Sequence, residues 1–377
     1  MLFKSLLAAL VALSPVAARA AVVQPAYHLA ATWKLAGEGG WDYLTVDSAA
    51  HRLYITRGTR IQVINTDSGE LVGEVVGHFG EMMQLGAKLG MPDFPLTSAM
   101  FRGRIAGAHG VAIDAGAHLG YISSGQTNSV LLFDTQTLKA VGAPIRVGER
   151  PDAIVFEPTT KRVLAFNAGS NDVSLIDTQT AKVVQTVALG SNPESGVADG
   201  AGHVWVNLEG SSELVELNAL DGKILMRSSL APGEEPTGIA YDARNHRVFS
   251  GCANKTMIVT DAATGKKLTS LPIGEGVDAG GFDPKRGLAF SSNGRDGTLS
   301  VVGFDDTKLS VLNTVATHIG ARTMALDPQS GAIFLVAANY EAAAPAANGE
   351  KPRRPKMIPG SAVVLKLEPG LSLNPTP

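Results

Sequence analysis

Short apolar stretches alternate with turn-forming residues along most of the chain. The region from 152 to 189 shows the pattern clearly, with apolar stretches at 153–156, 163–166, 173–176 and 183–189. The breaks between them carry Gly, Asn, Asp and Pro, which favour turns. Branched and aromatic side chains dominate the stretches, and no sustained helical period is present. We therefore expect strands of four to seven residues rather than helices.

An acidic residue ends an apolar stretch seven times at nearly regular intervals. These residues are Asp47, Asp114, Glu157, Asp199, Asp242, Asp283 and Asp327, spaced by 67, 43, 42, 43, 41 and 44 residues. A second set of turn residues, Asp67, Asp134, Asp177, Asn218, Asp261 and Asp305, follows intervals of 67, 43, 41, 43 and 44. Both sets are expected to bond their own backbone in turns. Four strands per repeat of about 42 residues, repeated seven times with one insertion, predict an all-β, seven-bladed β-propeller.

The last repeat lacks a fourth strand of its own. It is interrupted after Tyr340, resumes at 362–367 and then ends. Residues 28–35 are apolar, extended in pattern and otherwise without a partner. We expect this N-terminal strand to complete the last blade and close the ring, because an unpaired sheet edge is a liability. Residues 21–377 are therefore predicted to form a single propeller domain.

The repeat from Val163 to Pro193 reads VLAFNAGSNDVSLIDTQTAKVVQTVALGSNP and resembles the YVTN-type repeat of YncE-like proteins. The stretches beginning at Trp41 (WDYL), Glu235 (EPTG), Gly276 (GVDA) and Gly320 (GARTM) are similar to the strand-opening motifs of that family. The resemblance extends over nearly all of residues 39–368. It implies an exported seven-bladed propeller, but no single chemistry, because propellers host many functions.

Residues 1–20 have the features of a secretory signal peptide. Lys4 precedes an apolar run at 5–17, and Ala18-Arg19-Ala20 matches an A-x-A cleavage site. We expect cleavage near Ala20/Ala21 and a periplasmic or secreted protein. No later apolar segment is long enough to span a bilayer.

Charge and cysteine content exclude several classes of protein. Without Lys4 and Arg19, 30 basic residues remain against 35 acidic residues, a formal net charge of −5. That balance does not favour binding to nucleic acid, which depends on Lys and Arg contacts to phosphate. The single cysteine, Cys252, excludes an internal disulfide and Cys-rich zinc or haem-attachment motifs. Its expected role is that of a small, half-buried side chain, with a reactive thiol as the alternative.

The candidate site comes from comparing the repeats with one another. Five positions before each first-strand acidic residue, every repeat carries a polar side chain of a different kind, except that Asp recurs: Asp42, His109, Asp152, Glu194, Thr237, Asp278 and Arg322. The innermost strands of a propeller line its central channel, so we expect these residues to converge at the channel mouth and bind a ligand. Glu149, Glu235 and Glu275 are expected in the same loops.

Several carboxylates near one another need something to offset their repulsion. Arg322, His109, a cationic ligand, a raised carboxylate pKa or a divalent metal ion could each do so. The metal candidates are His109, Asp152, Glu194 and Asp278, and mixed His and carboxylate ligands suit zinc, manganese or iron. The alternative is a ring of polar side chains that is simply solvated. No other cofactor is expected.

Two insertions, 79–103 and 341–360, are predicted on the same face as the channel mouth. The first contains four of the nine methionines, Met82, Met83, Met91 and Met100. We expect them to pack as apolar filler in a lid. Alternatively they could bind Cu(I) together with His78 and His109. The second insertion is rich in Ala, Pro and basic residues, and is expected to be a loop that could contact an acidic partner.

These observations predict a monomeric exported propeller that binds a small molecule, metal ion or protein partner at its channel mouth without catalysis. The alternative is a metal-dependent hydrolase of the lactonase kind. In that interpretation Asp152, Glu194 or Asp278 would hold the metal and His109 would be the general base. Lactonase propellers with such a site have six blades, whereas seven repeats are present here.

Overall fold

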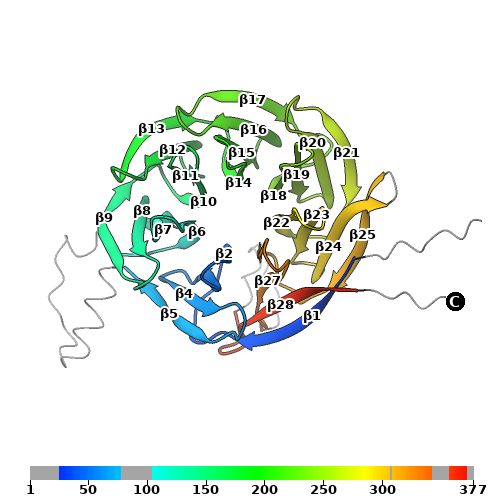
Figure 1. Cartoon of the computed structure of the whole chain (residues 1–377), viewed down its shortest axis with the longest axis horizontal. Coiled ribbons are helices and arrows are strands. Elements are labelled where there is room, and N and C mark those ends of the chain that lie inside the picture. The colour runs from blue at the N-terminus through cyan, green and yellow to red at the C-terminus, as the bar shows by residue number, and fades with distance from the viewer. Residues whose placement is uncertain (1–24, 78–103, 306–307, 342–355, 372–377) are drawn as a thin grey trace, which may run out of the picture.

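Seven four-stranded antiparallel sheets radiate from a common axis (Figure 1). This arrangement confirms the predicted all-β, seven-bladed propeller. The computed structural model describes residues 25–77, 104–305, 308–341 and 356–371. Within these residues the helical content is one 3-10 turn, η2 (Gly125–Thr127).

In blades 1 to 6 the chain enters at the axis and runs outward through four sequential strands (Figure 1). Blade 1 consists of β2 (Leu44–Asp47), β3 (Arg52–Thr56), β4 (Arg60–Asn65) and β5 (Leu71–Val76). Blade 2 consists of β6 (Ala108–Asp114), β7 (Leu119–Ser124), β8 (Ser129–Asp134) and β9 (Ala140–Arg146). Blade 3 consists of β10 (Pro151–Glu157), β11 (Arg162–Asn167), β12 (Asp172–Asp177) and β13 (Lys182–Ala188).

The next three blades repeat this order. Blade 4 consists of β14 (Pro193–Ala198), β15 (His203–Leu208), β16 (Glu213–Asn218) and β17 (Ile224–Ser229). Blade 5 consists of β18 (Pro236–Asp242), β19 (Arg247–Cys252), β20 (Thr256–Asp261) and β21 (Lys267–Pro272). Blade 6 consists of β22 (Val277–Asp283), β23 (Leu288–Asn293), β24 (Thr298–Asp305) and β25 (Lys308–Ala316).

Blade 7 joins the two ends of the domain. It consists of β26 (Met324–Leu326), β27 (Ile333–Ala337), β28 (Val363–Leu371) and, outermost, β1 (Pro25–Lys34). β1 pairs antiparallel with β28 from Pro25↔Leu371 to Lys34↔Val363. The predicted closure by an N-terminal strand is therefore confirmed (Figure 1).

The core lies between blades, because the two middle strands of each sheet are buried on both faces. In blade 3, β11 is buried at every residue from Val163 to Asn167, whereas β13 has an exposed or half-buried residue at every position. Phe166 packs in one cluster with Val204 and Val206 of the next blade. Blade-to-blade packing of this kind fixes the starts of the innermost strands around the channel.

The acidic turn residues bond their own backbone, as predicted. Asp177 Oδ1 accepts hydrogen bonds from the amides of Gln179 (3.1 Å) and Thr180 (2.8 Å). Blade 1 differs from the prediction, because Asn65 rather than Asp67 accepts the turn bonds. Asp67 instead lies 2.9 Å from the imidazole of His51.

Candidate functional site

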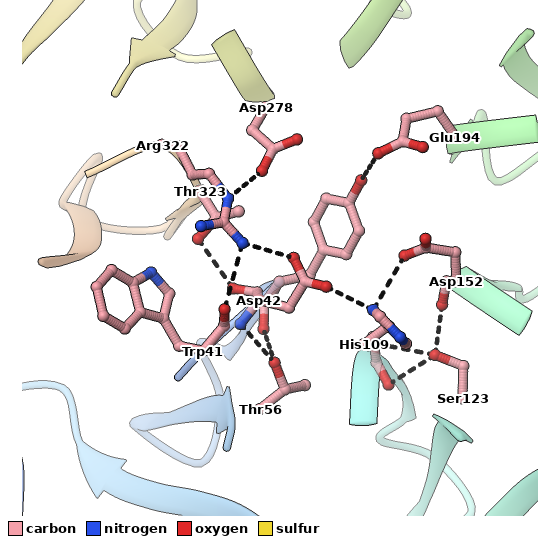
Figure 2. Close-up of polar contacts among 12 residues, drawn as sticks. Trp41, Asp42, Thr56, His109, Ser123, Asp152, Glu194, Asp278, Arg322 and Thr323 are labelled. Carbon is pink, nitrogen blue, oxygen red and sulfur yellow. Dashed lines mark hydrogen bonds and ion pairs between the residues drawn. The ribbon is translucent and has the colours of Figure 1, made fainter. Parts of the chain in front are cut away.

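The seven polar residues identified by spacing lie at the inner ends of the blades. Each innermost strand of blades 2 to 6 carries its polar residue at the second position: His109, Asp152, Glu194, Thr237 and Asp278. Asp42 and Arg322 precede β2 and β26 by two residues. Figure 2 shows Asp42, His109, Asp152, Glu194, Asp278 and Arg322 around one common space at the axis.

His109 lies between two carboxylates. Its Nδ1 is 2.6 Å from Asp42 Oδ2 and 3.5 Å from Asp152 Oδ1 (Figure 2). The hydrogen bond with Asp42 is the largest influence on the imidazole and raises the pKa of His109 despite its partial burial. The side chain of His109 remains 35% exposed, so this group is open to the channel mouth.

Arg322 joins the carboxylates on the other side of the mouth. Its Nε donates to Asp278 Oδ2 at 2.5 Å, and its Nη2 is 3.6 Å from Asp42 Oδ1. Asp42 therefore lies between the two cationic side chains, with one oxygen toward His109 and the other toward Arg322. Its main chain is held as well, because the amide donates to Thr56 Oγ1 (3.0 Å) and the carbonyl accepts from Thr323 Oγ1 (2.9 Å).

Three of these side chains have the geometry of a metal site. Asp42, His109 and Asp152 each offer one ligand atom, and these atoms lie within 4.8 Å of one another. Asp42 was not among the metal candidates chosen from the sequence. Glu194 and Asp278 were among them, but neither belongs to the cluster of three, which is the one such group in the described part of the chain.

Thr237 occupies the ring position but has a different set of contacts. Its hydroxyl donates to the carbonyl oxygen of Val277 in the next blade at 2.7 Å, and the residue is buried. It therefore joins blades 5 and 6. The structure gives it no polar contact with the charged residues of the mouth.

Tyr43 crosses the channel. It follows Asp42 in blade 1, and its hydroxyl donates to Glu194 Oε1 of blade 4 at 3.2 Å. A cavity of about 170 Å³ continues deeper along the axis, lined by Tyr43, Thr45, Ser195, Asp278 and several glycine and aliphatic residues. Burial, followed by the charges of Glu194 and Asp278, raises the pKa of Tyr43 well above its ordinary value, so it remains a phenol.

Burial and mutual repulsion raise the pKa values of the mouth carboxyls. Burial is the largest cause for Asp152, whose pKa rises to about 6. It is also the largest cause for Glu194, whose pKa rises to about 9, with further increases from Asp152, Asp278 and Glu209. Burial likewise raises the pKa of Asp278, although Arg322 opposes the shift. A raised pKa means that the ionised form of each of these carboxyls is disfavoured in the mouth.

Glu209 adds to the negative charge and was not identified from the sequence. It follows β15, accepts a hydrogen bond from Asn192 Nδ2 at 2.7 Å, and its charge raises the pKa values of Glu194 and Asp278. A signal was present in the repeats, because the residue after the second strand is Gly or Ala in five blades. The seven residues are Arg57, Gly125, Ala168, Glu209, Ala253, Gly294 and Ala338.

Other residues expected near the mouth have separate roles. Glu275 lies 2.8 Å from Lys255 Nζ and 3.1 Å from Arg295 Nη1, in an exposed ion-pair network. Glu149 and Glu235 are exposed in their loops. Cys252 is fully buried, and burial raises the pKa of its thiol to about 12, so the alternative of a reactive thiol is wrong.

The first predicted insertion, 79–103, lies outside the described residues, as do His78 and residues 342–355 of the second insertion. β5 and β6, which flank the first insertion in the chain, end and begin at the mouth face. The described ends of the second insertion are joined by a hydrogen bond from the Glu341 amide to the Lys356 carbonyl at 2.8 Å. The lid and the Cu(I) site remain predictions.

Replacing Glu194 by glutamine should stabilise the protein at alkaline pH. Because burial raises its folded-state pKa from 4.5 to about 9, wild-type stability falls as pH rises through that window. Glutamine keeps an acceptor for Tyr43 but never ionises. We expect Glu194→Gln to gain about 1–3 kcal/mol at pH 8 and nothing at pH 4, measured by denaturant unfolding. Exposed Glu149→Gln is the matched control, and an equal gain there would contradict the burial argument.

The fold and the mouth together define a seven-bladed β-propeller with a charged, partly closed channel. Compared by sequence, no family model and no curated protein matches the chain. Compared by structure, it is similar to a chain of Kuenenia stuttgartiensis hydrazine synthase, with a TM-score of 0.63 and 14% identity. The match covers 78% of this chain and 92% of that chain. At this identity the similarity shows the fold alone. No helix in the described residues has the length and apolar character needed to cross a membrane.

Proposed function

We propose that this protein is an exported, YncE-like propeller that binds a cation at its channel mouth without catalysis. The observation that carries the proposal is the position of His109, whose Nδ1 faces the carboxylates of both Asp42 and Asp152. One nitrogen and two oxygens converging from three blades can bind a divalent ion of the zinc, manganese or iron class. The raised pKa values of Asp152 and Asp278, caused first by burial and then by neighbouring carboxylates, support a cationic ligand, because its charge would stabilise their ionised forms.

The surroundings of His109 favour binding over turnover. A general base needs a free nitrogen within reach of the proton it removes. Nδ1 points between the carboxylates of Asp42 and Asp152, and Nε2 lies beside Gly125, close enough that an added Cβ there would be 2.9 Å away. Nδ1 therefore faces two potential ligand groups of the chain itself, an arrangement that suits a metal ligand or an ion-paired group.

Metal binding by the purified mature protein tests the proposal. We expect Mn²⁺, Co²⁺ or Zn²⁺ to bind with one equivalent per chain in equilibrium dialysis, and elemental analysis to find a metal after purification. Asp42→Asn, His109→Gln and Asp152→Asn should each weaken binding more than about tenfold, a loss above roughly 1.4 kcal/mol. Exposed Glu149→Gln should bind as wild type. Equal affinity in all four variants, or no metal binding by the wild type, would overturn the proposal. The polar ring would then be explained by solvation alone.

The second candidate function is metal-dependent hydrolysis of a lactone or ester. It is favoured by the carboxylates beside His109, because a divalent ion held by carboxylates can polarise a carbonyl and activate water. In this alternative His109 would act as base and Asp152, Glu194 or Asp278 would hold the ion. Turnover of lactones or esters by the metal-loaded protein, lost with a chelator and in His109→Ala, would establish it over the binding proposal.

Export, oligomeric state and partner binding are part of the proposal. Residues 1–20 would direct export and be removed, which N-terminal sequencing of the protein from the periplasm or medium would test. We expect Ala21 as the first residue. We also propose that the protein is a monomer. Where the bound cationic group is part of another protein, we propose that this partner docks at the mouth face. Light scattering of the metal-loaded protein measures its mass.

A further inference from the structure

Asp42 reaches the channel mouth on a loop rather than within a strand. His109 and Asp152 lie within their innermost strands, whereas β2 begins two residues after Asp42. The segment before Asp42 links β1 to blade 1 and contains Gly37, Gly39 and Gly40, of which Gly37 and Gly39 have positive φ values of 76° and 108°. Glycine-rich backbone loses much conformational entropy when it is fixed. Something other than strand pairing must therefore hold this loop.

Four successive carbonyls of the loop accept hydrogen bonds from blade 1 side chains. Arg57 Nη2 donates to the carbonyls of Gly37 (3.1 Å) and Gly39 (2.9 Å). Gln62 Nε2 donates to the Ala36 carbonyl (2.9 Å), and Arg60 Nη2 donates to the Glu38 carbonyl (3.0 Å). Arg57 thus makes two of the four bonds, including the one nearest Asp42 in the chain, at Gly39.

Burying the charged side chain of Arg57 is energetically unfavourable, so another interaction must offset its cost. The side chain is 1% exposed, its Nε has no hydrogen-bond partner, and no described carboxylate lies within ion-pair distance. Its Nη1 donates to Gln62 Oε1 at 3.1 Å. Burial lowers its pKa to about 10, which still leaves it charged at neutral pH. An unpaired buried charge is among the least favourable arrangements in a protein.

The fold itself does not require an arginine at this point. The residue after the second strand is Gly or Ala in five of the seven blades. Blade 1 differs from those five in carrying the Asp42 loop. The adjacent Thr56 also holds this region, because its hydroxyl accepts from the Asp42 amide at 3.0 Å.

We infer that Arg57 is a positioning residue that fixes the glycine-rich loop and so places the Asp42 carboxylate against His109 and Arg322. The guanidinium, with its planar set of donors, is suited to binding two carbonyls from one side chain. Its effect on metal binding rests on the function proposed above, whereas its effect on Asp42 geometry does not.

Two measurements on Arg57→Met test the inference. In metal-free protein at one pH, NMR resonances of the His109 ring should shift toward those of Asp42→Asn, because the carboxylate moves. In the metal titration, Arg57→Met should weaken affinity about 10- to 100-fold, as loss of an orienting partner typically does. Arg57→Lys, which can still bind one carbonyl, should recover part of both effects.

A control and a double variant separate positioning from general destabilisation. Arg162→Met removes an arginine that also has a buried, unbonded Nε but binds Asp177 at the other end of blade 3. It should lower stability and leave the His109 ring resonances and metal affinity unchanged. In the Asp42→Asn background, Arg57→Met should weaken metal binding no further, because residues acting through one group are not additive.

The outcomes distinguish this inference from the proposed function. Shifted His109 resonances in Arg57→Met, with no metal bound by wild type, would retain the positioning role and reject the metal proposal. Metal binding by wild type, with His109 resonances and affinity unchanged in Arg57→Met, would overturn the positioning role alone. Fully additive losses in the double variant would also overturn it.

Discussion

Replacing Tyr27 by alanine is expected to lower the free energy of unfolding by about 3–5 kcal/mol, the range for large aromatic truncations in a core. Tyr27 lies on the closing strand β1 and is 4% exposed. Its ring meets Phe290 of blade 6 edge-on at 5.0 Å between centroids, and its hydroxyl donates to the Gly331 carbonyl at 3.1 Å. It therefore fixes the N-terminal strand to two blades at once.

Denaturant unfolding of Tyr27→Ala, Tyr27→Phe and Leu29→Ala measures the effect. Tyr27→Phe removes the hydrogen bond alone and should cost about 0.5–1.5 kcal/mol. Leu29 lies on the same strand but is 53% exposed, so Leu29→Ala should be nearly neutral. Deleting residues 21–36 should be more severe and expose the edge of β28 to aggregation. Unchanged melting temperatures in the deletion and in Tyr27→Ala would show that closure contributes little.

The architecture was accessible from the sequence because its determinants are local and repeated. Turn residues such as Asp177 and Glu157 bond amides two and three positions ahead, so they recur with the blade period whatever the rest of the molecule does. The closing strand was found by a similar argument, since one apolar stretch lacked a partner and one blade lacked a strand. The number of blades and the closing strand can both be inferred from the length of the repeat, without knowing where any side chain points.

The site was accessible only in part, because spacing places Cα atoms but does not decide which side chains pair. Thr237 occupies the ring position, yet its hydroxyl donates to a backbone carbonyl of the next blade. Asp42 comes between His109 and Arg322 because its blade is next to both of theirs, a relation that exists only once the ring has closed. Tyr43 of blade 1 contacts Glu194 of blade 4 across the channel, and no local sequence pattern predicts a contact between residues so far apart in the chain.

Affinity for a divalent cation should fall more than about 100-fold between pH 8 and pH 5, because protons compete with the metal for its ligands. The Asp42 hydrogen bond raises the pKa of His109, and burial raises that of Asp152 to about 6. Both groups are protonated at pH 5, and both must lose their protons before they can bind a metal. Glu194, with a pKa of about 9, stays protonated between pH 5 and pH 8, so it does not contribute to the change of affinity with pH.

Titration calorimetry of Mn²⁺ binding in buffers of different ionisation enthalpy counts the protons released. Near pH 5.5 we expect nearly two protons per metal bound by wild type, and about one by Asp152→Asn, which retains His109. His203→Gln is the control, since that histidine has a similar contact, 3.0 Å from Asp199, at the opposite end of its blade. It should leave proton release unchanged. Affinity independent of pH, or the same proton count in Asp152→Asn as in wild type, would mean that the cation binds elsewhere than between Asp42, His109 and Asp152.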